Sequence, residues 1–174
     1  MGVLIKRIFL YIYSWSFKSI LICTILSVIS CTLLSLLASK KISKAIYFIM
    51  FAASTIAIVF FTITNRSSSA EHTARLIPFA SFKNAGYGAY QSMWLNAFFF
   101  LPLGLSLPYL LPEKIKRKVL STILISAAFS LCIEAVQFIF KLGLCETDDV
   151  IINTLGAAIG TLSYIFAHVN STRD

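Results

Sequence analysis

The chain has 174 residues, of which 58% are hydrophobic and only 13% are charged, and its mean hydropathy is +0.85. Soluble globular domains carry about 25% charged residues, so this composition excludes a water-soluble domain and indicates an integral membrane protein. The net charge of +8 favours contact with anionic lipid headgroups over contact with nucleic acid in so apolar a chain. Four cysteines without C-x-x-C spacing are typical of small apolar helix residues rather than of a disulfide framework.

The N-terminal residues are basic and then aromatic, with Lys6 and Arg7 preceding the run IFLYIYSWSF. Tyr and Trp are enriched at the membrane–water interface. Residues 1–18 are therefore predicted to form an interfacial segment, either as a surface helix or as an extension of the first span. Apolar sequence continues well beyond a usual signal-peptide core, which disfavours a cleaved signal peptide.

Charged residues mark the ends of five apolar stretches. A stretch of about 21 residues, at a rise of about 1.5 Å per residue, covers roughly 31 Å, the thickness of a bilayer's hydrocarbon core. In lipid, each backbone polar group must be satisfied within its own segment. The predicted fold is therefore an all-α bundle of about five transmembrane helices, over residues 19–39, 45–65, 91–111, 119–140 and 150–168.

The basic residues also predict an orientation. Short basic clusters at 40–44 and 112–118 lie against predicted helix ends, where the positive-inside bias is strongest. We therefore predict a multi-pass protein of the cell membrane with these two loops inside and the loops at 66–90 and 141–149 outside. Membrane lipids are the expected partners, no nucleic acid and no cofactor is expected, and the oligomeric state is left open.

The fourth predicted helix carries polar residues on one face inside a membrane span. Their spacing of four, four, three and four positions places five residues on that face: Ser126, Ser130, Glu134, Gln137 and Lys141. An ionisable group within a span costs about 3 kcal/mol on insertion scales, so it usually faces the bundle interior and has a partner. Glu134 is then either a structural acid bonded to neighbouring helices or a functional one, and its place within the membrane favours function.

The loop before the fifth predicted helix is acidic, with Glu146, Asp148 and Asp149 next to the helix N-terminus. Carboxylates there complement the helix dipole, and Asp148 or Thr147 is predicted to cap the helix. Capping explains one or two of these acids, and it explains the third poorly. The loop is therefore a candidate part of a site.

A stripe of polar and small residues continues into the fifth predicted helix, where Asp149, Asn153, Gly156 and Gly160 are spaced by four, three and four. The G-x-x-x-G motif allows another backbone to approach closely. We predict that the fourth and fifth helices meet along this stripe, which would bring Glu134 and the other polar residues of both helices together.

The third predicted helix places Asn96, Phe100 and Gly104 on one stripe, and Pro102 and Pro108 are expected to bend it. Upstream of this helix, Arg75 is a fixed cation that could offset the carboxylates of the acidic loop. Its planar guanidinium suits a carboxylate or a phosphate.

The candidate site is thus one outward-facing polar cluster. Its predicted ligand-binding residues are Arg75, Asn96, Glu134, Gln137, Asp149 and Asn153. A structural role is predicted for Pro78, Pro102, Gly104, Gly156 and Gly160. No resident metal site and no catalytic residue is assigned.

Four of these segments, taken in order, resemble the VanZ-like family, named for a teicoplanin-resistance protein. They are RLIPF from Arg75, N-x4-LPLG-x3-P from Asn96, E-x-x-Q from Glu134, and DDVIINTLG-x3-G from Asp148. The resemblance covers about half of the chain. It implies a small multi-helix membrane protein of the bacterial cell envelope, and its named member lowers susceptibility to a lipoglycopeptide. We therefore expect a VanZ-like domain at 66–168, preceded by the segment 1–18 and a helix pair at 19–65.

Two functions from different classes remain. The first is a non-enzymatic envelope protein whose polar cluster binds a lipid or cell-wall-related headgroup, or a lipoglycopeptide such as teicoplanin. The second is an intramembrane hydrolase or transferase for a lipid-linked substrate, with Glu134 or Asp149 as general base, Arg75 steadying an anionic group, and Mg²⁺ or Ca²⁺ as a conceivable ligand of the oxygen donors. The sequence contains neither H-E-x-x-H nor G-x-S-x-G, which favours the first. An ion pathway is disfavoured because the other spans offer no second acid.

Overall fold

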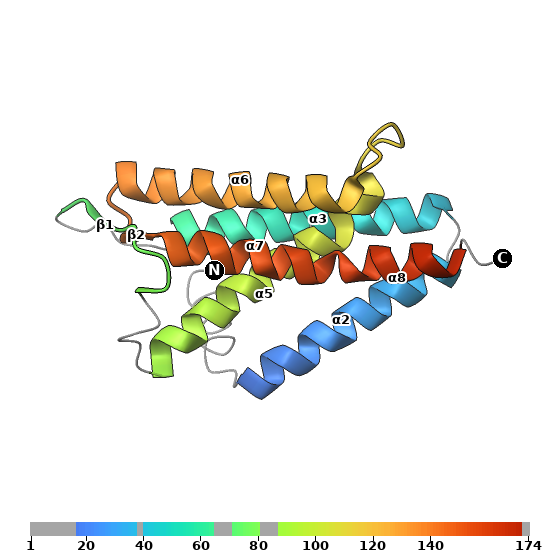
Figure 1. The fold of residues 1–174 in the computed structure, drawn as a ribbon, viewed down its shortest axis with the longest axis horizontal. Coiled ribbons are helices and arrows are strands. Elements are labelled where there is room, and N and C mark those ends of the chain that lie inside the picture. Colours follow the sequence, from blue (N-terminus) through green and yellow to red (C-terminus); the bar gives the residue numbers. More distant parts are fainter. Residues whose placement is uncertain (1–16, 38–39, 65–70, 81–86, 172–174) are drawn as a thin grey trace.

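The structure is a computed structural model that describes residues 17–37, 40–64, 71–80 and 87–171. The predicted interfacial segment 1–18 lies outside the described residues except for its last two. Most of the described residues are helical (Figure 1). The helices are α2 (Phe17–Leu37), α3 (Lys40–Val59) with its π-helical end η1 (Phe60–Thr64), α5 (Tyr87–Leu110), α6 (Lys118–Ile139), α7 (Thr147–Gly160) and α8 (Leu162–Ser171).

The predicted all-α membrane fold is confirmed. Among the described residues, four helical segments are long and apolar enough to cross a membrane: Lys44–Ile63, Met93–Leu110, Lys118–Ile139 and Thr147–His168. The first predicted span corresponds to α2, whose apolar part, Leu21–Leu37, is shorter than these four. The last predicted span consists of two helices, because α7 ends at Gly160 and α8 begins at Leu162.

Lipid as solvent explains which side chains face outward. On α6 the exposed positions include Leu124, Leu131 and Ile139. Polar residues of the same helix are buried in the bundle, namely Thr122, Ser126, Ser130, Glu134 and Gln137. This pattern is the reverse of a soluble amphipathic helix, as expected where the apolar face meets acyl chains and the polar face needs partners from other helices.

Helices α5 and α7 are in backbone contact through three glycines. A Cβ atom on Gly156 would lie 2.0 Å from the carbonyl oxygen of Ala97, and one on Gly104 would lie 1.9 Å from that of Ala157. Gly160 is equally tight, since its Cβ would lie 2.4 Å from the carbonyl oxygen of Leu101. The close approach predicted from G-x-x-x-G is therefore present, but its partner is α5. The prediction that these glycines face the fourth helix, α6, is wrong.

The apolar core lies where α5 meets α3, α6 and α7, around Phe100, Ile58, Ile133 and Ala157. Helix α5 is continuous through Pro102 and Pro108. The hydroxyl of Ser106 donates to the carbonyl of Pro102 over 2.7 Å, which partners one of the polar groups in this proline-containing stretch.

The two ends of the bundle differ in charge. Strands β1 (Thr73–Arg75) and β2 (Leu144–Glu146), the end of α6 and the start of α7 lie together at one end, which we call the acidic end (Figure 1). The turn between α5 and α6 and the end of α8 lie at the other end, which we call the basic end (Figure 1). The loops predicted to lie inside (112–118) and outside (141–149) are thus at opposite ends. Which end faces outside remains a prediction.

Candidate functional site

The acidic end is closed by two short parallel strands that the sequence analysis did not predict. Thr73 pairs with Leu144, and Arg75 pairs with Glu146. Each strand has only three residues, too few for the alternating pattern that identifies a strand in sequence. Their pairing follows from the meeting of two loops, and it brings the predicted residue Arg75 to the acidic loop.

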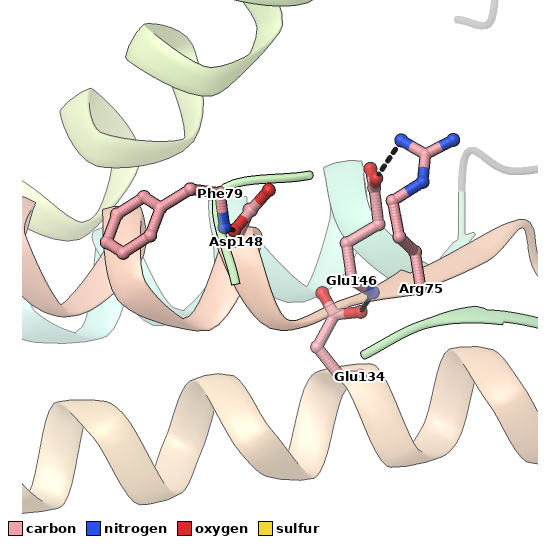
Figure 2. A network of polar contacts seen from close by, with 5 residues as sticks. All are labelled: Arg75, Phe79, Glu134, Glu146 and Asp148. Atoms are coloured by element: carbon pink, nitrogen blue, oxygen red, sulfur yellow. Dashed lines mark hydrogen bonds and ion pairs between the residues drawn. The ribbon is translucent and has the colours of Figure 1, made fainter. Parts of the chain in front are cut away.

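Arg75 and Glu146 form an ion pair beside this strand pairing, with 2.8 Å between the guanidinium nitrogen Nη1 and the carboxylate oxygen Oε1 (Figure 2). The side chains are 46% and 21% exposed. Exposed pairs of this kind contribute about 0–1 kcal/mol. Arg75 is therefore placed as a counter-ion to the acidic loop, while the strand hydrogen bonds set its position.

Glu134 is buried, with 3% of its surface exposed, and it reaches from α6 to the start of α7. Its Oε2 atom accepts the backbone N–H of Glu146 over 2.9 Å (Figure 2). That N–H precedes the first turn of α7, because Glu146 is the N-cap residue of this helix. A carboxylate bonded to a backbone donor at a helix N-terminus is favoured by charge assistance and by the helix dipole.

The end of α6 turns the chain back toward Glu134. The N–H of Leu142 donates to the carbonyl of Gln137, and the N–H of Lys141 donates to that of Phe138, the hydrogen bonds of a Schellman motif. Lys141 occupies the left-handed region at φ 56°. It therefore lies beyond the helix, and the prediction that it continues the polar face of α6 is wrong.

Asp148 joins the acidic loop to the segment after β1. Pro78 and Phe79 form the corner of a turn closed by a hydrogen bond from Ala80 N–H to the carbonyl of Ile77. Proline is favoured at position i+1 of such a turn, which Pro78 occupies. Phe79 follows at position i+2, and its positive φ of 63° is that of a type II turn. The N–H of Phe79 donates to Oδ1 of Asp148 over 2.5 Å (Figure 2).

The predicted capping of α7 is therefore wrong. Its N-cap residue is Glu146, which makes no side-chain capping bond. Thr147 instead donates its hydroxyl to the carbonyl of Leu76 over 3.2 Å, and Asp148 binds Phe79. Both side chains bind the 76–79 segment. These long-range hydrogen bonds form in place of the local capping bonds.

Asn153 and Gln137 each connect two helices. Asn153 on α7 donates to Ser130 on α6 over 2.8 Å, and Gln137 on α6 donates to the carbonyl of Thr62 in η1 over 2.8 Å. The Oδ1 atom of Asn153 and the Oε1 atom of Gln137 are buried and have no hydrogen-bond partner among the described residues. Buried acceptors of this kind are uncommon and call for a physical explanation, of which a bound polar molecule is one.

Cys145 is a member of this region that sequence reasoning did not assign. Burial raises the pKa of its thiol, and the carboxylates of Glu134, Asp149 and Glu146 raise it further. Glu134 and Asp149 therefore both lie close to the same thiol. Sequence spacing could not predict that Cys145 lies in this cluster, because its neighbours come from α6 and α7 as well as from its own strand.

The structure thus brings five predicted residues toward the acidic end: Arg75, Glu134, Gln137, Asp149 and Asn153. Asn96 is not joined to them by a hydrogen bond or ion pair among the described residues, and its neighbour Ala97 contacts Gly156; its role in the site remains a prediction. In the described parts of the chain, no three His, Cys, Asp or Glu side chains are grouped as metal ligands.

Comparison with known proteins identifies one family. The family model described as VanZ/LLP1 matches residues 44–168, well over half of the chain. No curated protein and no solved structure matches the chain.

Proposed function

This chain belongs to the VanZ/LLP1 family, and we propose that it is a bacterial cell-membrane protein whose acidic end faces outside and binds a lipid or cell-wall-related headgroup. Binding of this headgroup would lower susceptibility to lipoglycopeptides such as teicoplanin, because the bound headgroup would be less accessible to the antibiotic at the membrane surface. The proposal makes the protein a binding protein rather than an enzyme.

The proposal rests on the buried amide oxygens of Asn153 and Gln137, which have no hydrogen-bond partner among the described residues. Leaving a buried acceptor unsatisfied costs about 1–3 kcal/mol, so a ligand donor that reaches one of them gains a hydrogen bond without displacing another. On α6, Glu134 lies between Ser130, which is the hydrogen-bond partner of Asn153, and Gln137, at about one helical turn from each. The three side chains therefore form a row that leads from the bundle interior to the acidic end.

Charge indicates which headgroup chemistry fits. In the described segments 71–80 and 134–149, five carboxylates stand against two fixed cations, Arg75 and Lys141. A region of this charge favours a ligand that offers hydrogen-bond donors or an amine, and it disfavours a bare phosphate. The matching headgroup is an amine- or hydroxyl-bearing one, such as an aminoacyl or sugar group on a lipid carrier.

The experiment makes one hydrogen-bonded pair of this row apolar while keeping the volume of its side chains. In the double variant Ser130→Ala/Asn153→Leu both partners of one interhelical hydrogen bond become apolar at similar volume, which is close to neutral for stability. We expect a melting temperature in detergent near that of wild type, loss of co-purifying lipid with an aminoacyl or sugar headgroup in native mass spectrometry, and loss of protection in a teicoplanin susceptibility assay. Cys132→Ala, on the exposed face of α6, is the matched control and should behave as wild type.

Two results would count against the proposal. If the double variant keeps both its co-purifying lipid and its protection, the row is not a binding site. If it loses both only because it melts at a much lower temperature or is absent from membranes, Asn153 and Ser130 are structural, and Gln137→Leu then repeats the test at the second unpartnered oxygen.

A further inference from the structure

A second site lies at the basic end, on the opposite side of the bundle from the acidic cluster. A cavity of about 450 Å³ opens there between the start of α6 and α8. Its lining has two parts: the basic residues Lys116, Arg117 and Lys118, and the apolar residues Val119, Leu120 and Ile123, with Tyr164 across from them. We propose that this cavity binds the phosphodiester headgroup of an anionic phospholipid.

The order of the lining residues matches the shape of a phospholipid. The three cations occupy consecutive positions immediately before and at the start of α6, and the apolar residues follow along the helix. A lipid whose phosphate sits among the cations can therefore lay an acyl chain along α6. Leu120 and Leu124 are exposed and continue this apolar surface.

Lys118 is the buried cation of this cavity. Its side chain is only 8% exposed, and its Nζ atom lies 3.3 Å from a carboxylate oxygen of Glu113, whose own side chain is 96% exposed. Nζ also lies 6.0 Å from the centre of the Tyr164 ring, within reach of a weak cation–π attraction. A buried ammonium whose ion-pair partner is fully in solvent is poorly compensated, and a phosphate in the cavity supplies the compensation.

The start of α6 adds backbone donors to the same place. Its N-cap residue, Arg117, makes no side-chain capping bond, and the first turn contains no acidic residue. The first backbone N–H groups and the helix dipole therefore favour an anion at this position. Cavity, cations and helix terminus coincide, which is the arrangement of known basic lipid pockets between membrane helices.

The probe is phosphatidylglycerol, added to the full-length protein in a neutral detergent and followed by native mass spectrometry and by melting temperature. We expect one retained phosphatidylglycerol and a raised melting temperature. Phosphatidylcholine, which has the same phosphate but a compensating cation, should be retained less, and inorganic phosphate should give no shift.

Variants locate the site. Each Lys or Arg near a membrane phosphate typically contributes about a fivefold change in affinity, so Lys116→Gln/Arg117→Gln should weaken phosphatidylglycerol binding roughly 25-fold. Both residues are exposed, and their replacement should leave folding intact. The control is Lys44→Gln, which removes an exposed cation outside the cavity and should change affinity less than twofold.

Three outcomes would overturn the proposal. Equal weakening by Lys44→Gln would show general attraction to the positive end rather than a site. Equal retention of phosphatidylcholine would show that the net charge of the headgroup is not recognised, so the cavity would not be a site for an anionic phospholipid. An equal melting shift with inorganic phosphate would show a site for a free anion. None of these tests depends on the acidic end, so this inference stands or falls separately from the proposed function.

Discussion

The Glu134 carboxylate accepts the backbone N–H of Glu146 over 2.9 Å, so a buried acid on α6 holds the residue that precedes α7. The same residue, Glu146, is ion-paired with Arg75 and strand-paired with it. A single loop residue thereby links α6, α7 and the segment after α3. The acidic end is thus held by a strand pair and by carboxylates that accept backbone N–H groups.

Glu134→Gln tests whether the charge or only the hydrogen bond is needed. Glutamine keeps an oxygen acceptor for Glu146 N–H, so we expect a melting temperature within a few degrees of wild type together with lost headgroup retention. Glu134→Leu leaves that N–H without its acceptor, which costs about 1–3 kcal/mol, and should melt clearly lower. Leu131→Ala, at an exposed position of α6, controls for truncation on this helix. Full binding by Glu134→Gln would assign Glu134 to structure alone.

Gly156→Ala should destabilise the protein strongly, because a Cβ atom there would lie 2.0 Å from the backbone oxygen of Ala97 and the two helices would have to separate. We expect a loss well above the usual range for a surface change, about 0.5 kcal/mol, measured as a large fall in melting temperature. Leu162→Ala, at an exposed site on α8, should have little effect. A normal melting temperature for Gly156→Ala would contradict the close α5–α7 contact.

Arg75→Lys separates recognition from charge balance. The exposed ion pair with Glu146 contributes about 1 kcal/mol at most, so stability should hardly change. A lysine is a point charge without the planar fork of arginine, and we expect headgroup retention and teicoplanin protection to fall if Arg75 contacts the ligand. Wild-type behaviour of Arg75→Lys would limit the role of Arg75 to counter-charge at the strand pair.

The thiol of Cys145 reports on the acids around it. Burial and the nearby carboxylates, Glu134 first among them, raise its pKa, so its alkylation rate should rise only at higher pH than that of an ordinary thiol. In a variant with Cys145 as the sole cysteine, Glu134→Gln should shift the rate–pH profile to lower pH, because it removes one of the charges that disfavour the thiolate. The urea-unfolded protein is the reference. A profile that does not respond to Glu134→Gln would contradict the placement of that carboxylate.

Orientation can be checked at the two ends with single cysteines in a background without native ones. Glu71→Cys, at the acidic end, should react with an impermeant maleimide on intact cells, whereas Glu113→Cys, in the basic loop, should react only after lysis. Both positions are exposed, so access to the reagent and not burial decides the result. The reverse pattern would place the acidic end inside and remove the basis for an envelope-facing function.

The amino-acid sequence by itself determined the spans and their polar face. Apolar stretches of membrane length, bounded by charged residues, require helices because lipid offers no hydrogen bonds to an open backbone. The spacing of Ser126, Ser130, Glu134 and Gln137 likewise required one buried face on α6, since helical periodicity is local and survives any arrangement of neighbours.

Tertiary structure alone decided which neighbour each residue meets. Asn153 and Gly156 are three positions apart, which turns them about 60° from one another around α7. One edge of the predicted stripe therefore meets α6 through Asn153 and Ser130, and the other meets α5 through Gly156 and Ala97. The strand pair and the Asp148–Phe79 bond join segments about seventy residues apart. No local pattern can specify such contacts, because they exist only once the helices have brought those loops to the same end.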